Sequence, residues 1–213
     1  AEQDYEVVTG LNPFNEQAYL QLGTLYIARE QPDKAIELFD EAIELKPEFA
    51  RAYSERGRAK LMKGDKNGSV EDLKKALEEL IDNYRCGHEK ATINLDFQLK
   101  DPEIFADPFH LIHLVDNLIS NALKYAGDAE VSLESTATAI LIRVRDHGEG
   151  IPEDQLEAVF KPFFRLDTAR NTEDGSVGLG LAIARTLIHQ HGGELRLSNA
   201  PDGGLLAEIQ LPL

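Results

Sequence analysis

Apolar residues recur at helical spacing in the first eighty positions of the chain. Two amphipathic runs are separated by the turn-forming segment EQPDK at 30–34. The apolar positions are Leu20, Leu22, Leu25 and Tyr26 in the first run, and Ala35, Ile36, Phe39, Ala42 and Ile43 in the second. The pattern predicts a helical hairpin whose two apolar faces pack on each other.

A shift of 34 residues aligns this hairpin with the residues that follow it. The shift superposes Tyr19 on Tyr53, Gly23 on Gly57, Ala35 on Ser69, Phe39 on Leu73 and Ala42 on Ala76. This period and these landmarks resemble the tetratricopeptide repeat, in which small residues pack where two helices cross. The resemblance predicts a partial repeat at 1–15 and repeats at 16–49 and 50–80. It also implies a peptide or protein ligand for the repeats.

The pattern changes after position 80. Residues 81–90 predict a linker, and residues 91–213 predict a second domain in which strand-like and helix-like segments follow one another. Strands are predicted at 92–99, 129–135, 138–146, 194–199 and 205–211, and helices from near Asp107, from Glu153 and over 178–190. Asp107 is the predicted N-cap, with Pro108 in the first turn. A mixed sheet with helices on one face predicts a two-layer α/β sandwich, so the chain as a whole is α+β.

A polar stretch at 165–177 interrupts this second domain, and a loop of that length in a compact domain predicts a functional lid.

The net charge of the chain limits which kinds of partner it can bind. The 213 residues carry a formal net charge of −16, with 19 acidic and 13 basic side chains in residues 1–90 and 19 and 9 in residues 91–213. Neither half offers the basic face that nucleic acid requires, so we expect no nucleic-acid partner. A nucleotide is compatible with this charge, because a few backbone amides and one metal ion are enough to bind it.

Cysteine content and hydropathy indicate which cross-links and which cellular location to expect. Cys86 is the single cysteine, which excludes an internal disulfide and a cysteine-based zinc site. No apolar run approaches the ~20 residues of a membrane span, and no signal peptide is recognised. We therefore expect no membrane contact by this segment and a cytoplasmic location, either by itself or as the cytoplasmic part of a larger or membrane-bound protein.

Four sequence blocks occur in one order in the second half of the chain. They are NLISNALKY at 117–125, DHGEGIP at 146–152, FKPFFR at 160–165 and GSVGLGLAI at 175–183. These blocks resemble the N, G1, F and G2 boxes of the catalytic ATP-binding domain of sensor histidine kinases, within the ATPase family shared with gyrase, Hsp90 and MutL. The resemblance covers residues 91–213. It implies a Bergerat-type fold that binds ATP and Mg²⁺.

The first block carries the predicted phosphate and metal chemistry. The resemblance makes Asn121 the Mg²⁺ ligand, and one amide oxygen is enough because magnesium keeps water and phosphate oxygens. Lys124 is a candidate phosphate contact and Tyr125 a candidate contact of the base or ribose; taken alone, they read as a solvated lysine and a core aromatic. Asn117 falls where hydrolytic relatives carry a glutamate. The catalytic set is therefore Asn117, Asn121 and Lys124.

The second block carries the predicted base site. Asp146 ends a buried strand, where an unpaired carboxylate is costly unless a donor such as the adenine amino group satisfies it. The resemblance assigns Asp146 to adenine, lets the backbone approach the base at Gly148 and Gly150, and makes Ile151 an apolar wall.

The other two blocks are predicted to surround the phosphates. Gly178, Leu179 and Gly180 open a helix whose free N–H groups would face phosphate. Val177 stands where the family commonly has Ser or Thr, with Ser176 one place earlier. Phe160, Phe163 and Phe164 are predicted apolar anchors of the lid. Arg165 and Arg170 read equally well as γ-phosphate contacts and as solvated loop charges.

The resemblance implies the catalytic domain of a two-component histidine kinase. None of the six histidines lies in a phosphoacceptor box, and His88, which precedes an acid, lacks the following proline. The phosphate would therefore pass to a histidine hairpin, or on to a response regulator, supplied in trans. The alternatives are a nucleotide-switched scaffold without phosphotransfer and an anti-sigma-type serine kinase. Both a natural and an engineered fusion explain the repeats beside this domain.

Overall fold

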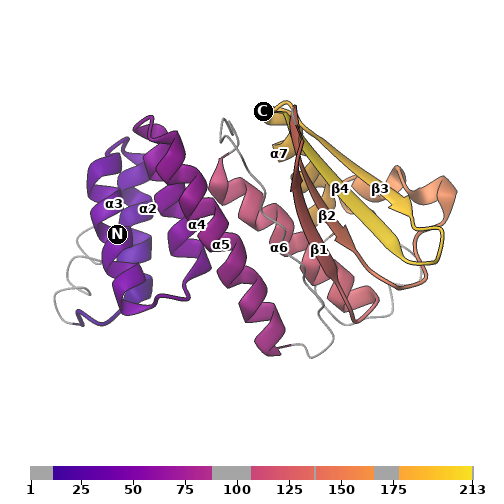
Figure 1. Ribbon diagram of the computed structural model, residues 1–213, viewed down its shortest axis with the longest axis horizontal. Helices are drawn as coiled ribbons and strands as arrows, with labels where there is room; N and C mark the ends of the chain where they lie inside the picture. Colours follow the sequence, from indigo (N-terminus) through magenta and orange to yellow (C-terminus); the bar gives the residue numbers. More distant parts are fainter. Residues whose placement is uncertain (1–11, 88–106, 137, 166–177, 213) are drawn as a thin grey trace. The chain divides into compact units, whose positions relative to one another are not determined.

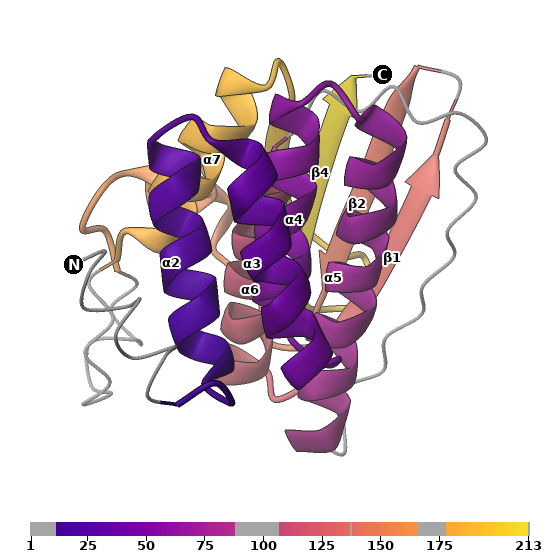
Figure 2. The same ribbon diagram turned by 90° about the vertical axis from the view of Figure 1, so that its left-hand side faces the viewer.

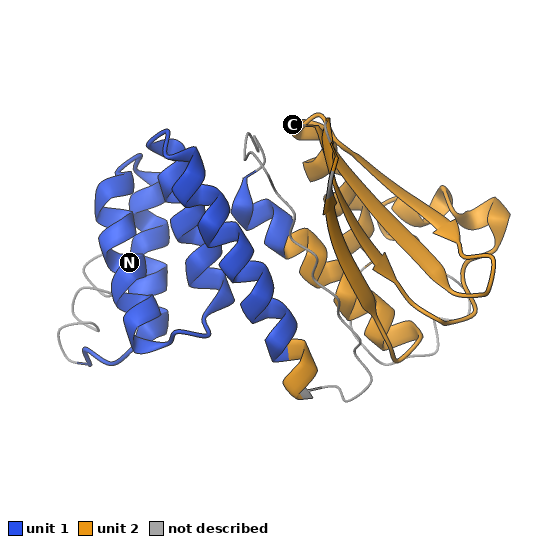
Figure 3. Cartoon of the chain, in the orientation of Figure 1, with its two compact units in different colours: residues 1–83, 102–112 blue, residues 84–101, 113–213 orange. Residues whose placement is uncertain are grey.

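The computed structural model describes residues 12–87, 107–136, 138–165 and 178–212. The chain divides into two compact units, one comprising 1–83 and 102–112 and the other 84–101 and 113–213 (Figure 3). The division falls inside two helices, α5 (Lys66–Gly87) and α6 (Pro108–Tyr125). Each unit is described by itself.

The first unit is a series of helices joined by short turns (Figure 2). The helices are α2 (Glu16–Ala28), α3 (Pro32–Leu45), α4 (Ala50–Met62) and α5 (Lys66–Gly87). Side chains cap two of them: Asn15 accepts from the Ala18 N–H at 3.0 Å, and Asp65 accepts from the Gly68 N–H at 3.0 Å. The predicted hairpins are confirmed. The partial repeat predicted at 1–15 falls mostly outside the described residues.

The core of this unit is the apolar face that the sequence pattern predicted. Phe39 is fully buried among Leu20, Ala35 and Ala42. A Cβ at Gly23 would lie 2.5 Å from the Phe39 ring, so α2 and α3 pack this closely because position 23 has no side chain. The packing role predicted for Gly23 is confirmed.

Helix α5 is longer than the sequence analysis predicted. It continues to Gly87, so residues 81–87 are helical and not the linker expected at 81–90. Ile81 is fully buried, and the Tyr84 hydroxyl donates to Asp116 at 2.7 Å, which explains why the helix persists. Burial and this hydrogen bond raise the pKa of Tyr84.

The second unit is a sheet with helices against one face (Figure 1). Strands β1 (Glu130–Ser135), β2 (Ala139–Arg145), β3 (Glu194–Asn199) and β4 (Leu205–Pro212) are arranged in the order β1-β2-β4-β3. Helices α6 (Pro108–Tyr125) and α7 (Gly180–Gln190) and the short helices η1 (Glu153–Gln155) and η2 (Ala158–Phe160) complete it, with the first turn of α6 assigned to the other unit. The two-layer α/β sandwich is confirmed.

Pairing among the described strands is antiparallel throughout, whereas the sequence analysis predicted a mixed sheet. Two of the three pairings join consecutive strands through short turns, which requires antiparallel pairing. The strand predicted at 92–99 lies outside the described residues. Alternation places Ile140, Ile142, Val144 and Ile209 in the core.

Asp107 begins α6 as predicted, since its carboxylate accepts from the Phe109 N–H at 3.0 Å and Pro108 is the first helical residue. Among the described helices, none is long and apolar enough to span a membrane.

Candidate functional site

The C-terminal half of α6 carries Asn117 and Asn121 in different environments. Asn117 is exposed, and its Nδ2 donates to the His113 carbonyl one turn earlier at 3.0 Å. Asn121 is half-buried, and its amide makes no hydrogen bond to another described residue. The Nζ of Lys124 lies 5.5 Å from the Tyr125 ring centroid, and that ring is 56% exposed. Asn121 therefore presents an uncommitted amide oxygen.

This oxygen fits the requirement for magnesium. The described residues contain no group of three or more His, Cys, Asp or Glu side chains that could enclose a metal ion. Magnesium does not need one, because it usually keeps several waters and takes phosphate oxygens with one or two protein ligands. A neutral amide on an acidic domain suits a cation that arrives with its own phosphates.

Asp146 follows the last residue of β2 and is 8% exposed. Its Oδ1 accepts two backbone hydrogen bonds, from Gly148 at 2.9 Å and from Leu205 at 3.0 Å. No described residue donates to its Oδ2. A carboxylate oxygen has more than one lone pair, so this nearly buried group has acceptor capacity available for a ligand N–H.

Close approaches at glycines join the N, G1 and G2 boxes. A Cβ at Gly148 would lie 2.9 Å from the Cβ of Ala126, which links the G1 box to the end of α6. A Cβ at Gly180 would lie 3.4 Å from Oδ1 of Asn117, which links the G2 box to the N box. These three motifs thus lie around one region of the domain, and a glycine stands at each close approach.

The F box is joined to the G2 box in a similar way. The Phe163 N–H donates to the Gly178 carbonyl at 3.0 Å. Phe160 is buried, and the Arg185 guanidinium from α7 lies 4.4 Å from its ring centroid while donating to Glu157 at 2.8 Å. Helix α7 therefore holds the buried end of the F box in place.

Phe163 does not pack against the described residues as Phe160 does, since its side chain is 70% exposed. Its φ of 65° lies in the left-handed region, which is uncommon for a residue other than glycine. The lid that Phe163 was predicted to anchor lies almost wholly outside the described residues, so its anchoring role stays a prediction. Phe160 fits the anchoring role, and Phe164 is half-buried.

The beginning of α7 has the features of an anion site. Leu179, its N-cap residue, makes no side-chain capping hydrogen bond. The N–H groups of residues 180–182 precede the first intrahelical bond, from the Ile183 N–H to the Leu179 carbonyl, and no described side chain accepts from them; the helix dipole adds positive potential there. Gly178, with a φ of 73°, turns the chain into this helix. Arg165 is described and half-buried, whereas Arg170, Ser176 and Val177 lie outside the described residues.

Two residues near Asp146 were missed by the sequence analysis. Asn199, the last residue of β3, forms two hydrogen bonds with the backbone of Ile151, at 2.9 and 2.7 Å. Gly204 lies so close to Asp146 that a Cβ there would overlap the Asp146 carbonyl oxygen. Their only sequence signal is the segment NAPDGG, which is typical of a hairpin turn and says nothing about a site.

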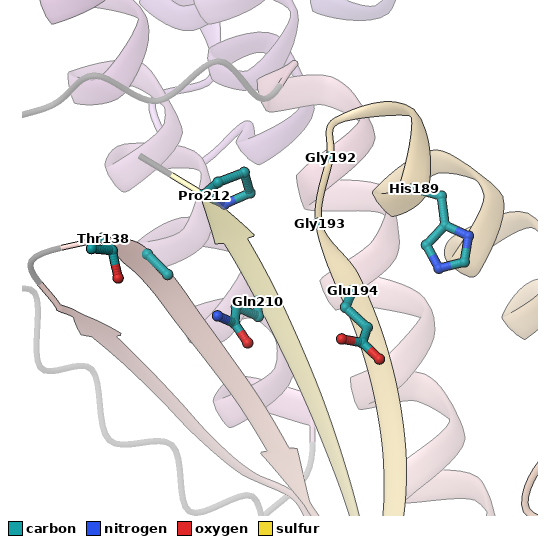
Figure 4. A pocket seen from close by; sticks show the side chains of 8 residues that line it. Thr138, His189, Gly192, Gly193, Glu194, Gln210 and Pro212 are labelled. Atoms are coloured by element: carbon teal, nitrogen blue, oxygen red, sulfur yellow. The ribbon is translucent and has the colours of Figure 1, made fainter.

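A hollow of about 310 Å³ lies elsewhere in the second unit (Figure 4). It is lined by residues from β2, β4, the start of β3 and the end of α7, including Thr138, His189, Glu194 and Gln210. No residue of the four motifs lines it. The motif residues therefore define the candidate site, and this hollow does not.

Comparison with known families identifies both parts of the chain. Residues 106–213 match the family of histidine kinase-, DNA gyrase B- and HSP90-like ATPases, and residues 16–49 match the tetratricopeptide repeat. The chain therefore belongs to the histidine kinase-, DNA gyrase B- and HSP90-like ATPase family, and it contains a tetratricopeptide repeat. Both resemblances inferred from the sequence are confirmed.

Similar curated proteins are sensor histidine kinases. The chain is 44% identical over 105 residues to the sensor histidine kinase GtrS of Pseudomonas aeruginosa. The matched region covers 49% of this chain and 21% of GtrS. It is 35% identical over 154 residues to the sensor histidine kinase CpxA of Escherichia coli, covering 70% of this chain and 34% of CpxA. The chain thus spans about a fifth to a third of the length of these relatives.

Solved structures agree in fold. A mycobacterial sensor histidine kinase, MprB, matches with a TM-score of 0.53 and 28% identity, covering 64% of this chain and 95% of the MprB chain. The ATP-binding domain of PrrB from Mycobacterium tuberculosis matches with a TM-score of 0.51 and 28% identity, covering 67% and 93%.

Proposed function

We propose that the second unit is the Mg-ATP-binding catalytic domain of a two-component sensor histidine kinase, and that it transfers the γ-phosphate to a histidine supplied in trans. The observation that carries the proposal is Asp146, whose nearly buried carboxylate has acceptor capacity to spare in a domain where close contacts join the four motifs pairwise. Family membership and the sensor kinases among the relatives support it.

The base end of the site would select adenine through Asp146. Two backbone N–H groups hold Oδ1 and fix the orientation of the carboxylate, so Oδ2 can accept from the amino group of adenine. Ile151 is buried beside this carboxylate loop and offers an apolar surface to the ring. Gly148 and Gly150 would let the backbone approach the base.

The phosphate end would use α6 and the beginning of α7. The uncommitted amide oxygen of Asn121 would ligate magnesium, which when bound neutralises part of the triphosphate charge. Lys124 would contact phosphate as a point charge, and the N–H groups from Gly180 onward would receive phosphate oxygens. Tyr125, with its exposed ring, would contact the ribose or base. Arg165 remains a candidate for the γ-phosphate.

Phosphoryl transfer itself requires little covalent chemistry from the protein, because positioning and charge stabilisation supply most of the catalysis. The acceptor would be a histidine on a helical hairpin of a separate chain or segment, with a response regulator downstream. The repeats would recruit a peptide or protein ligand. A cytoplasmic location for this segment is part of the proposal.

Calorimetric titration tests the binding step. The chain is titrated with the β,γ-imido analogue of ATP and magnesium, beside Asp146→Asn and the exposed control Asp154→Asn. Loss of a charged acceptor should weaken binding roughly ten-fold or more in Asp146→Asn, with the control unchanged. No binding by the wild-type chain, or equal binding by Asp146→Asn, contradicts the proposal.

A transfer assay tests the reaction. Labelled ATP is incubated with the chain and an isolated phosphoacceptor hairpin. Acid-labile label on the hairpin supports a histidine kinase. Acid-stable label indicates a serine kinase, and nucleotide binding without transfer indicates a nucleotide-switched scaffold.

A further inference from the structure

The turn between β3 and β4 holds both ends of the loop that follows β2. At the first end, the Asp146 N–H donates to the Leu205 carbonyl at 2.9 Å, and the Leu205 N–H donates to Asp146 Oδ1 at 3.0 Å. At the second end, Asn199 bonds the backbone of Ile151. Asn199 and Leu205 are partners in the β3–β4 register, so the two attachment points face each other across one hairpin.

The contact at Ile151 uses both halves of the Asn199 side-chain amide. Oδ1 accepts from the Ile151 N–H at 2.9 Å, and Nδ2 donates to the Ile151 carbonyl at 2.7 Å. A side-chain amide therefore pairs with a backbone residue as a neighbouring strand would. Neither a carboxylate, which only accepts, nor a hydroxyl, which is too short to span both atoms, reproduces this pair.

The residues on either side of Ile151 permit and extend this contact. Gly150 has a φ of 73°, and a Cβ there would lie 2.5 Å from Asn199 Oδ1, so Gly150 allows Asn199 to approach. Nδ2 also donates to Glu153 Oε1 at 3.3 Å, at the start of η1. Asn199 thus fixes the loop where its apolar residue, Ile151, becomes buried.

We propose that Asn199 is a positioning residue for base recognition, a role that rests on the proposed function. It holds Ile151 at a set position relative to Asp146, so that the apolar wall and the carboxylate oxygen together fit one purine edge. Without Asn199, Asp146 keeps both backbone donors, but Ile151 loses its side-chain pair. Binding of adenine nucleotide then weakens, and discrimination between purines weakens with it.

The test compares two nucleotides on the full chain. Dissociation constants are measured with magnesium for the β,γ-imido analogues of ATP and of inosine triphosphate, in which a carbonyl replaces the adenine amino group. The variants are Asn199→Ala, Asn199→Asp and Asn199→Ser, and the control is Ser198→Ala, an exposed neighbour on β3. Thermal unfolding without nucleotide shows that each variant is folded.

We expect Asn199→Ala to bind the ATP analogue roughly ten-fold more weakly, since both hydrogen bonds to Ile151 are lost. We also expect it to reduce the preference for the ATP analogue over the inosine analogue, measured as the ratio of their dissociation constants. The dissociation constant of Asn199→Asp should resemble that of Asn199→Ala, and that of Asn199→Ser should lie between Asn199→Ala and the wild type. The dissociation constants of Ser198→Ala should match those of the wild type. An unchanged ratio in folded variants, with binding unchanged or equally weakened for both nucleotides, overturns the inference and leaves the proposed function standing. Failure of the wild-type chain to bind either analogue overturns the proposed function itself.

Discussion

At the scale of single residues, Asn117 sets an expectation for the fate of the γ-phosphate. Its amide donates to the His113 carbonyl, and an amide cannot take a proton from water as a carboxylate can. The proposed site should therefore hydrolyse ATP slowly. Asn117→Glu introduces a candidate general base and should raise ATP hydrolysis roughly ten-fold or more, as measured by phosphate release.

Asn117→Gln is the matched control, because it has the length of glutamate without the charge. Its hydrolysis rate should stay at the wild-type value. Equal rates for Asn117→Glu and the wild type would contradict the role given to this position, even if nucleotide binding is intact.

Gly204 gives a second prediction at this scale. Its φ is 90°, and a Cβ there would overlap the Asp146 carbonyl. Gly204→Ala should push the β3–β4 turn away from Asp146, destabilise the second unit by about 3 kcal/mol and abolish measurable nucleotide binding. Chemical unfolding and calorimetry measure the two effects.

Gly203 is the control for backbone strain alone. Its φ is 101°, but a Cβ there would meet no atom within 4 Å. Gly203→Ala should cost about 1 kcal/mol and keep nucleotide binding. Similar losses in the two variants would mean that backbone conformation, and not the approach to Asp146, is what matters.

Single residues also differ in whether the sequence alone could reveal their role. Asp146 could be proposed from a local motif, and its buried position at a strand end agrees with that proposal. Asn199 could not, because its partner Ile151 is 48 residues away and only the fold brings them together. Phe163 shows a similar limit, because an aromatic residue in a motif suggests burial, whereas its side chain is 70% exposed.

At the scale of elements, periodicity predicted the strands well. Strand β3 has the bounds expected from its alternation, and β4 is one residue longer. The end of α5 was missed because the segment IDNYRCG is mostly polar, and helical periodicity is weak there. Ile81 and Tyr84 keep it helical through burial and through the bond to Asp116, which no local pattern encodes.

Helix α4 contains a buried carboxylate that makes the stability of the first unit depend on pH. Glu55 is fully buried, and within the described part of the chain neither of its oxygens accepts a hydrogen bond. Burial raises its pKa above the ordinary value of 4.5, and nearby Asp107 adds to the rise, while Arg58 and Arg51 oppose it. The folded state therefore holds a proton on Glu55 more tightly than the unfolded state does.

The sign of the effect follows from this raised pKa. The contribution of Glu55 to stability is fully present below its ordinary pKa and is lost as pH rises through the folded value. Glu55→Gln removes the ionisation, so it should stabilise the chain by on the order of 1 kcal/mol near neutral pH and by less in acid.

Urea unfolding followed by circular dichroism, at a series of pH values from acid to neutral, measures this difference. Glu41→Gln changes an exposed carboxylate on α3 and is the control. A stability difference between Glu55→Gln and the wild type that does not grow with pH would contradict the assignment.

At the scale of the whole molecule, the formal net charge of −16 opposes the approach of a nucleotide. Both halves of the sequence contribute to it, so free ATP meets repulsion that is not limited to the site. Magnesium would help in two ways, by reducing the charge of the triphosphate and by ligation to Asn121. The first effect is long-range and screened by salt, whereas the second is local and is screened much less.

Titrations with and without magnesium, at low and high ionic strength, separate these two effects. Removing magnesium with a chelator should weaken binding of the ATP analogue at both ionic strengths. The loss of affinity should be roughly ten-fold larger at low salt, where the Debye length is about 30 Å. Adenosine has no phosphates and should bind equally in all four conditions.

In Asn121→Ala, the magnesium effect remaining at high salt should be small, since ligation is lost and repulsion is screened. A magnesium effect that is the same at both ionic strengths in the wild type would show that the net charge does not influence nucleotide binding.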